Sequence, residues 1–195
     1  MKTKATLILP VFFFFSFFTA GSQIIFKRDA ALQKALQQVL TDFPNRLENI
    51  SGRLLQENIE SSDYASKVIF PGAETCTVTS YKSQKNKSRS WQAFLPETES
   101  FADAKKQYHY IFMQVKNMGI LLPGSKKPAV SKGNYDEPKE EKKFAGSLFR
   151  ITGDDTVYQD VKVEVALQYT ITGWQVSVYV YEKKEDDEIR PDGEE

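Results

Sequence analysis

The most regular pattern of apolar and polar positions in the chain runs from residue 100 to residue 119. Apolar residues recur there at spacings of three and four, which places them on one stripe of an α-helix. The members of this stripe are Phe101, Ala104, Tyr108, Ile111, Val115 and Met118. Ser100 is a favourable N-cap residue, and Gly119 is expected to end the helix in the left-handed conformation. The segment therefore predicts an amphipathic helix that needs an apolar surface to cover.

A second stripe of the same kind lies nearer the start of the chain. Its members, at spacings of four, three and four, are Leu32, Leu36, Val39 and Phe43. Asp29 precedes the stripe as an N-cap candidate, and Pro44 follows it, where a helix is expected to stop. The pattern predicts a second amphipathic helix between these two residues.

Strict alternation of apolar and polar residues, which is typical of half-buried β-strands, marks several other segments. These are residues 64–70, 75–82, 91–95 and 144–152. Residues 53–62 fit either a helix or a strand. Residues 123–143 contain three prolines and many charges but almost no apolar residues, so they predict a charged surface loop.

The strongest β signal is a pair of alternating runs at 161–171 and 174–181, separated by Thr172-Gly173. A two-residue turn at Thr172-Gly173 predicts a hairpin in which every apolar residue falls on one face. The predicted partners are Ile171 with Trp174, Tyr169 with Val176, Leu167 with Val178, and Val165 with Val180. Such a face would anchor a small domain that has no disulfide.

Together these elements predict an α+β fold. We expect an antiparallel β-sheet of about six strands, arranged as helix-plus-meander units, with the two amphipathic helices packed on one face. Residues 23–182 are expected to form a single domain. The alternative is two small α+β subdomains joined near Pro96. Whether the two helix-plus-strand halves arose by duplication stays open, because they show no convincing repeat at the level of residues.

The first 22 residues have the three-part pattern of a cleaved secretory signal peptide. Lys2 and Lys4 precede an apolar run at 7–18, and small residues follow at 19–22. An uncleaved membrane anchor is the alternative, but a spanning helix needs about 20 apolar residues. We therefore expect export to the periplasm or the cell exterior, with no integral membrane span after cleavage. Residues 183–195 are expected to form an acidic disordered tail.

The charge balance and the absence of known motifs narrow the function. The 26 basic and 26 acidic residues give no basic excess, which argues against a nucleic-acid partner. The chain has one cysteine, Cys76, in an alternating segment where burial is expected, and one histidine, His109. These cannot assemble a common zinc site, and no phosphate-binding or nucleophile-elbow motif is present. We expect no metal or cofactor and no catalytic residue, with a small secreted hydrolase using His109 as the alternative.

One surface is a candidate for binding. Tyr179 and Tyr181 project from the polar side of the predicted hairpin, beside Glu164 and Gln168 on the facing strand. Tyrosines among polar residues suit a peptide, a glycan or a partner protein, although tyrosine is also common on ordinary solvated strands. The sequence thus favours an exported, non-catalytic binding or envelope-associated module. The use of the glycosylation sequons at Asn49 and Asn86 is left open.

Overall fold

The structure is a computed structural model that describes residues 27–82, 88–153 and 156–183. The predicted signal peptide at 1–22, the sequon at Asn86 and residues 184–195 of the predicted acidic tail lie outside the described residues. Neither α-helix in the described part of the chain is long and apolar enough to cross a membrane.

Within these ranges the fold is α+β, with two α-helices and one antiparallel sheet of nine strands. The helices are α1 (Ala30–Asp42) and α2 (Phe101–Val115). The strands are β1 (Ser51–Glu57), β2 (Ser61–Ser66), β3 (Thr75–Tyr81), β4 (Arg89–Phe94), β5 (Gly119–Ile120), β6 (Ala129–Gly133), β7 (Phe144–Thr152), β8 (Val161–Tyr169) and β9 (Trp174–Glu182). Short 3₁₀ turns η1, η2 and η3 lie at Phe43–Asn45, Glu140–Lys142 and Thr156–Tyr158.

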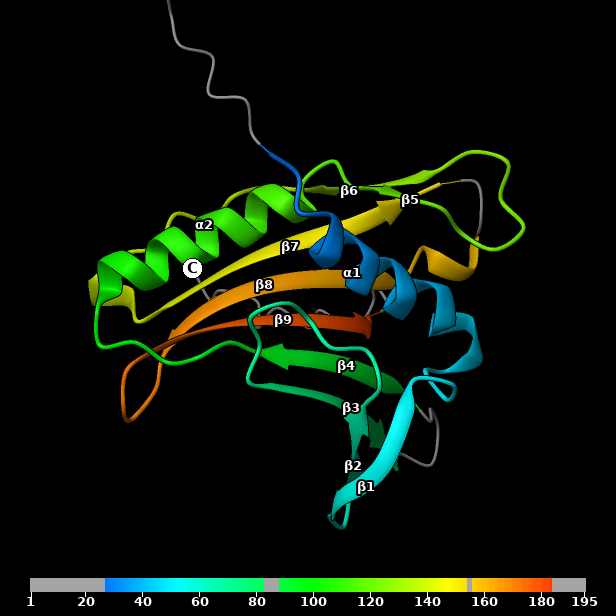
Figure 1. Ribbon diagram of the computed structural model, residues 1–195, viewed down its shortest axis with the longest axis horizontal. Helices are drawn as coiled ribbons and strands as arrows, with labels where there is room; N and C mark the ends of the chain where they lie inside the picture. The colour runs from blue at the N-terminus through cyan, green and yellow to red at the C-terminus, as the bar shows by residue number, and fades with distance from the viewer. Residues whose placement is uncertain (1–26, 83–87, 154–155, 184–195) are drawn as a thin grey trace, which may run out of the picture.

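The strands follow the order β1-β2-β3-β4-β9-β8-β7-β6-β5 across the sheet. Each helix is therefore followed by a meander, and the two meanders meet where β4 pairs with β9. Both helices lie on the same side of the sheet (Figure 1). Because β4 precedes Pro96 and β9 follows it, the segments on either side of the proposed subdomain boundary share one continuous sheet.

The sheet has more strands than the six or so that were expected. β1 covers the first half of the range 53–62, which fitted either a helix or a strand. β5 and β6 are the other additions, and β6 lies inside 123–143, which was predicted to be a loop. That prediction was wrong because β6 has few apolar residues of its own and is held by backbone pairing to β7. Tertiary pairing of this kind overrides local composition.

Both predicted helix starts are confirmed by their caps. The Ser100 side chain accepts a hydrogen bond from the backbone N–H of Asp103 at 3.2 Å. The Asp29 carboxylate accepts from the N–H groups of Ala31 and Leu32 at 3.0 and 3.1 Å. These bonds satisfy donors that have no partner inside the helix, which fixes the point where each helix begins.

The end of α2 differs from the prediction. The helix ends at Val115, the left-handed residue is Asn117 with φ of 58°, and Gly119 instead begins β5. The reason is competition from β6. The backbone of Ser131 accepts from Asn117 N–H at 3.1 Å and donates to Met118 O at 3.2 Å, so the chain leaves the helix to pair with a strand.

The hairpin of β8 and β9 forms, but its predicted register is wrong by two residues. Tyr169 pairs with Trp174, and the partners that follow are Leu167 with Val176, Val165 with Val178, and Val163 with Val180. The connection is a four-residue loop. Thr170 closes it through its N–H and its hydroxyl, which both donate to the Gly173 carbonyl, and Ile171 is 99 % exposed. A shift of two keeps every side chain on its face, so the apolar set still faces the helices.

The turn between α1 and β1 is built on a buried carboxylate. Asp42 accepts hydrogen bonds from the side-chain amides of Asn45 and Asn49, at 3.2 and 2.6 Å, and from Ile50 N–H at 3.1 Å. The amide nitrogen of Asn49 is the atom that glycosylation would modify. Use of this sequon would therefore require breaking its bond to Asp42.

Candidate functional site

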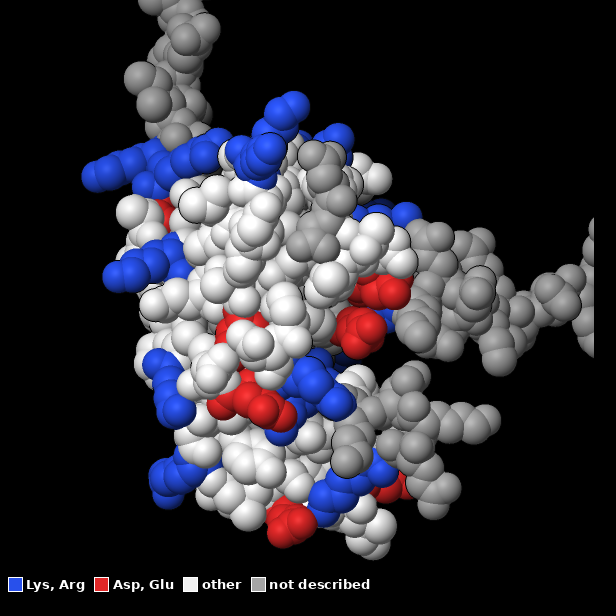
Figure 2. Space-filling model, turned by 90° about the vertical axis from the view of Figure 1, so that its right-hand side faces the viewer, with Lys and Arg blue, Asp and Glu red and all other residues white. Residues whose placement is uncertain are grey.

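A hollow of about 440 Å³ lies on the face of the sheet opposite α1 and α2, which we call the open face. Its lining comes from five strands that are neighbours in the sheet, from β3 through β4, β9 and β8 to β7. Figure 2 views the molecule from the side, and acidic and basic side chains both lie near the middle of that view. The open-face hollow therefore lies over the middle of the sheet.

The four residues singled out from the sequence all line this hollow. Tyr179 and Tyr181 come from β9, and Glu164 and Gln168 come from β8. Glu164 pairs directly with Tyr179 across the two strands, and all four side chains are half-buried. Alternation along the hairpin places them on the open face. That they bind a ligand stays a prediction.

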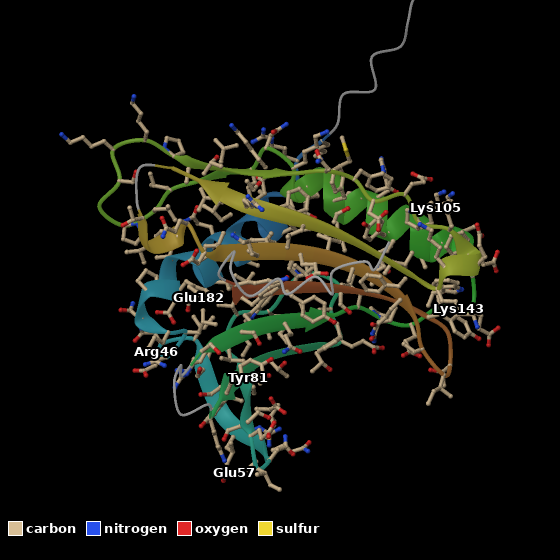
Figure 3. The ribbon with its side chains drawn as sticks, turned by 180° about the vertical axis from the view of Figure 1, so that it is seen from behind. Arg46, Glu57, Tyr81, Lys105, Lys143 and Glu182 are labelled. Atoms are coloured by element: carbon tan, nitrogen blue, oxygen red, sulfur yellow. The ribbon has the colours of Figure 1, made fainter. Side chains whose placement is uncertain are left out.

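Sequence reasoning missed the rest of the lining, notably Tyr81, Arg89, Gln92, Phe144 and Glu182. Figure 3, seen from the open face, labels Tyr81 and Glu182. The alternation in 75–82 does place Tyr81 on the face of the strand that points away from the buried Val78 side. The missing information was the pairing of β4 with β9, which sets Gln92 beside Tyr179 and has no signature in the local pattern.

One hydrogen bond organises the centre of the hollow. The Tyr181 hydroxyl donates to Glu164 Oε2 at 2.8 Å. Burial raises the pKa of Tyr181, and the carboxylate acceptor raises it further. Tyr181 therefore remains a protonated donor at neutral pH. Its hydroxyl occupies Oε2 of Glu164, and the other oxygen, Oε1, can accept a hydrogen bond from another donor.

Gly146 on β7 lies beside that second oxygen. It pairs with Ala166 on β8, diagonal to Glu164, and a Cβ at this position would come within 3.0 Å of Glu164 Oε1 and 3.2 Å of the Phe144 ring. A side chain at this position would therefore require the carboxylate or the ring to shift.

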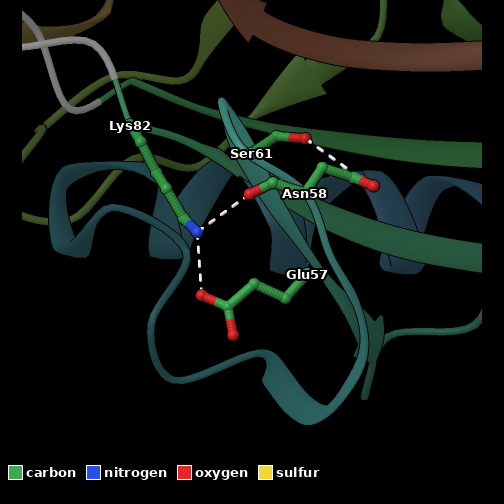
Figure 4. Close-up of polar contacts among 4 residues, drawn as sticks. All are labelled: Glu57, Asn58, Ser61 and Lys82. Carbon is green, nitrogen blue, oxygen red and sulfur yellow. Dashed lines mark hydrogen bonds and ion pairs between the residues drawn. The ribbon is translucent and has the colours of Figure 1, made fainter.

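Two positively charged side chains near the hollow, Arg89 and Lys82, contact groups that do not line it. Arg89 lies 3.6 Å from the Glu48 carboxylate and 3.5 Å from the Ser51 hydroxyl. Lys82, which follows Tyr81, donates to Glu57 Oε1 at 2.8 Å and to the Asn58 carbonyl at 3.0 Å (Figure 4). That lysine fastens the β1–β2 turn to the end of β3, and its bond and charge lower the pKa of Glu57.

The hollow presents several hydrogen-bond acceptors. The Gln92 amide nitrogen donates to the hydroxyls of Thr79 and Ser90, at 3.3 and 3.2 Å. Its carbonyl oxygen is then the part of the amide that can serve a ligand. Together with the carboxylates of Glu164 and Glu182, it favours ligands that donate hydrogen bonds.

The two other candidate reactive side chains lie outside the hollow. His109 is exposed on α2 and contacts the ring of Tyr135 edge-on, with 5.2 Å between ring centres. In the described part of the chain no serine or carboxylate hydrogen-bonds to it.

Cys76 is buried, as its alternating segment indicated, and accepts from Phe70 N–H at 3.3 Å. Burial raises the pKa of its thiol, which disfavours the reactive thiolate. The described residues also contain no group of three or more potential metal ligands among His, Cys, Asp and Glu.

Comparison of the chain with protein-family models finds no match, and neither curated proteins nor solved structures provide one.

The buried tyrosines predict an alkaline loss of stability. Tyr108 donates to or accepts from Ser147 at 2.6 Å, and burial raises its pKa as it does for Tyr181. A tyrosine whose pKa is raised by folding holds its proton more tightly when folded, so its stabilising contribution is present below about pH 10 and is lost above it. We expect the free energy of unfolding in urea to fall progressively as the pH rises above about 10.

The same measurement has matched variants. Tyr108→Phe and Tyr181→Phe should each reduce the slope of stability against pH, because the titrating group is gone. Tyr169→Phe, at a ring that is 46 % exposed, should leave the slope unchanged. A slope that is equal in all four proteins would contradict the assignment to Tyr108 and Tyr181.

Proposed function

We propose that this protein is an exported binding protein whose ligand occupies the open-face hollow. The observation that carries the proposal is the lining itself, which combines four aromatic rings with seven polar or charged side chains in a space of about 440 Å³. Ligand sites are typically concave and of this order of volume, with aromatic side chains for contact and polar groups that fix the ligand's orientation. Export is the part that depends on the signal-like pattern at residues 1–22.

The support for binding rather than catalysis comes from the groups that are present. The hollow holds carboxylates, amides, phenols, two serine hydroxyls and one guanidinium, and in the described residues no histidine lies among them. Tyr181 and Glu164 are hydrogen-bonded to each other. A nucleophile activated by an adjacent base is the usual arrangement for covalent catalysis. The hydrolase alternative requires His109 in a cleft, and the structure places it on the exposed side of α2 instead.

A retention experiment tests the proposal. The purified protein is incubated with an extract of the envelope of its source cells, washed by gel filtration and analysed by native mass spectrometry. Gln168→Trp fills the hollow from a half-buried position, and Ile171→Trp adds the same side chain on the exposed loop as a matched control. We expect wild type and Ile171→Trp to retain a ligand that Gln168→Trp does not.

Two results would overturn the proposal. One is retention of the same molecules by all three proteins, which would place binding outside the hollow. The other is the absence of any retained molecule on wild type. Circular dichroism of each variant establishes beforehand that the fold is intact.

A further inference from the structure

The charge balance of the open-face hollow indicates the chemistry of its ligand. Two carboxylates, Glu164 and Glu182, line it together with one guanidinium, Arg89. Arg89 faces Glu48 and Ser51, as described above, so its charge is already partly balanced. Glu164 belongs to none of the ion pairs that join described residues. The interior of the hollow is therefore anionic.

Glu164 is also the best-placed group for holding a ligand. Its side chain is half-buried, and charges removed from water are normally paired with an opposite charge. Tyr181 holds the carboxylate in place through Oε2. The Glu164 side chain therefore loses less conformational entropy when a ligand binds. Oε1 lies beside Gly146 and close to the Phe144 ring. A cationic donor is the partner that this oxygen lacks among the described residues.

The aromatic lining favours the same class of ligand. Tyr81, Tyr179, Tyr181 and Phe144 line the same hollow as the carboxylates, and aromatic rings attract cations through their quadrupoles. The combination of rings with a carboxylate is suited to an ammonium group. A neutral sugar would use the rings and acceptors but would leave the charge of Glu164 unbalanced.

We propose that the ligand of the open-face hollow carries a positively charged amine, which binds Glu164 between the surrounding aromatic rings. This inference rests on the proposed function, because it names the chemistry of a ligand in the same hollow. The shared chemistry is the ammonium group, whether it belongs to a free amine or to a lysine side chain of a peptide.

The test compares charged probes with neutral probes of the same shape. Choline is titrated against 3,3-dimethylbutan-1-ol, and butylamine against butanol, using NMR of ring-labelled tyrosine to obtain each Kd. A capped lysine peptide distinguishes a peptide source from a free amine, and methyl glucoside represents a neutral glycan. We expect each cation to bind about tenfold more tightly than its neutral counterpart. Butylammonium can form a charge-assisted hydrogen bond, and choline, which has no N–H, gains charge and cation–π attraction instead.

Matched variants assign the preference to one carboxylate. Glu164→Gln keeps the shape and an acceptor for Tyr181 but removes the charge, so the tenfold preference should disappear. Glu74→Gln, at an exposed position outside the hollow, should keep it. Urea unfolding of Glu164→Gln alongside wild type guards against misreading a folding defect in this variant.

The outcomes separate this inference from the proposed function. Equal affinity for charged and neutral probes, tighter binding of methyl glucoside than of any amine, or a preference that survives Glu164→Gln would each overturn the amine inference. The proposed function would still stand if the extract ligand is lost only in Gln168→Trp. If the extract ligand is retained by Gln168→Trp as well, both proposals fail.

Discussion

Replacing Val176 by aspartate is expected to lower the free energy of unfolding by more than about 4 kcal/mol, whereas the same replacement at Gln175 should cost less than about 1 kcal/mol. Val176 is fully buried and pairs with Leu167 on the side of the sheet that faces the helices. A carboxylate there would be removed from water without a partner. Gln175, the next residue on β9, lies half-buried on the open face.

Urea unfolding followed by tryptophan fluorescence measures this difference. The two variants have neighbouring positions on one strand and the same new side chain, so they differ only in the face that receives the charge. Similar losses of stability at both positions would contradict the assignment of one face to the core and the other to the open-face hollow.

Replacing Trp91 by alanine should lower the free energy of unfolding by about 3–5 kcal/mol, the range for deleting a large buried aromatic side chain. Trp91 is fully buried on β4, and its indole N–H donates to the Ser66 hydroxyl at 3.0 Å. Its ring centre lies 6.2 Å from that of Phe70. The side chain therefore joins β4 to the β2–β3 part of the sheet.

Two further variants separate the contribution of the Trp91 ring to stability from that of its indole N–H. Trp91→Phe keeps an aromatic ring but removes the N–H, and it should lose less than Trp91→Ala. Ser66→Ala leaves the buried indole N–H without its acceptor and should cost about 1–3 kcal/mol. These values come from equilibrium unfolding in urea. A loss of less than about 1 kcal/mol for Trp91→Ala would contradict its place in the core.

The sequence predicted the elements whose own residues carry a strong periodic pattern. The stripe from Phe101 to Val115 and the alternation from Val161 to Tyr169 are both present in the structure. The faces of β8 and β9 were also predicted, because a strand's two faces depend only on whether positions are odd or even. The register was not, since it depends on the hydrogen bonds of Thr170 to Gly173 and not on the apolar pattern.

The unpredicted parts depend on contacts between distant segments. β6 is a strand because β7 pairs with it, and α2 ends early because Ser131 bonds to Asn117 and Met118. The candidate site also contains some residues that a local pattern predicts and others that depend on contacts between distant segments. Tyr179, Tyr181, Glu164 and Gln168 could be placed on one face from the hairpin alone.

The remaining contributors could not be found in this way. Tyr81 and Gln92 reach the hollow only because β4 pairs with β9, and Phe144 only because β7 pairs with β8. The role of Gly146 is likewise visible only with Glu164 beside it. Local patterns carry no information about such pairings, which is why the hollow itself was not predicted.

The most direct measurement of the central claim is the NMR spectrum of the protein with labelled tyrosine rings, recorded with and without the ligand retained from the envelope extract. We predict that the signals of Tyr81, Tyr179 and Tyr181, which line the open-face hollow, change on binding, while that of Tyr110, exposed on α2, does not. Unchanged signals from the three hollow tyrosines in the presence of bound ligand would contradict the account.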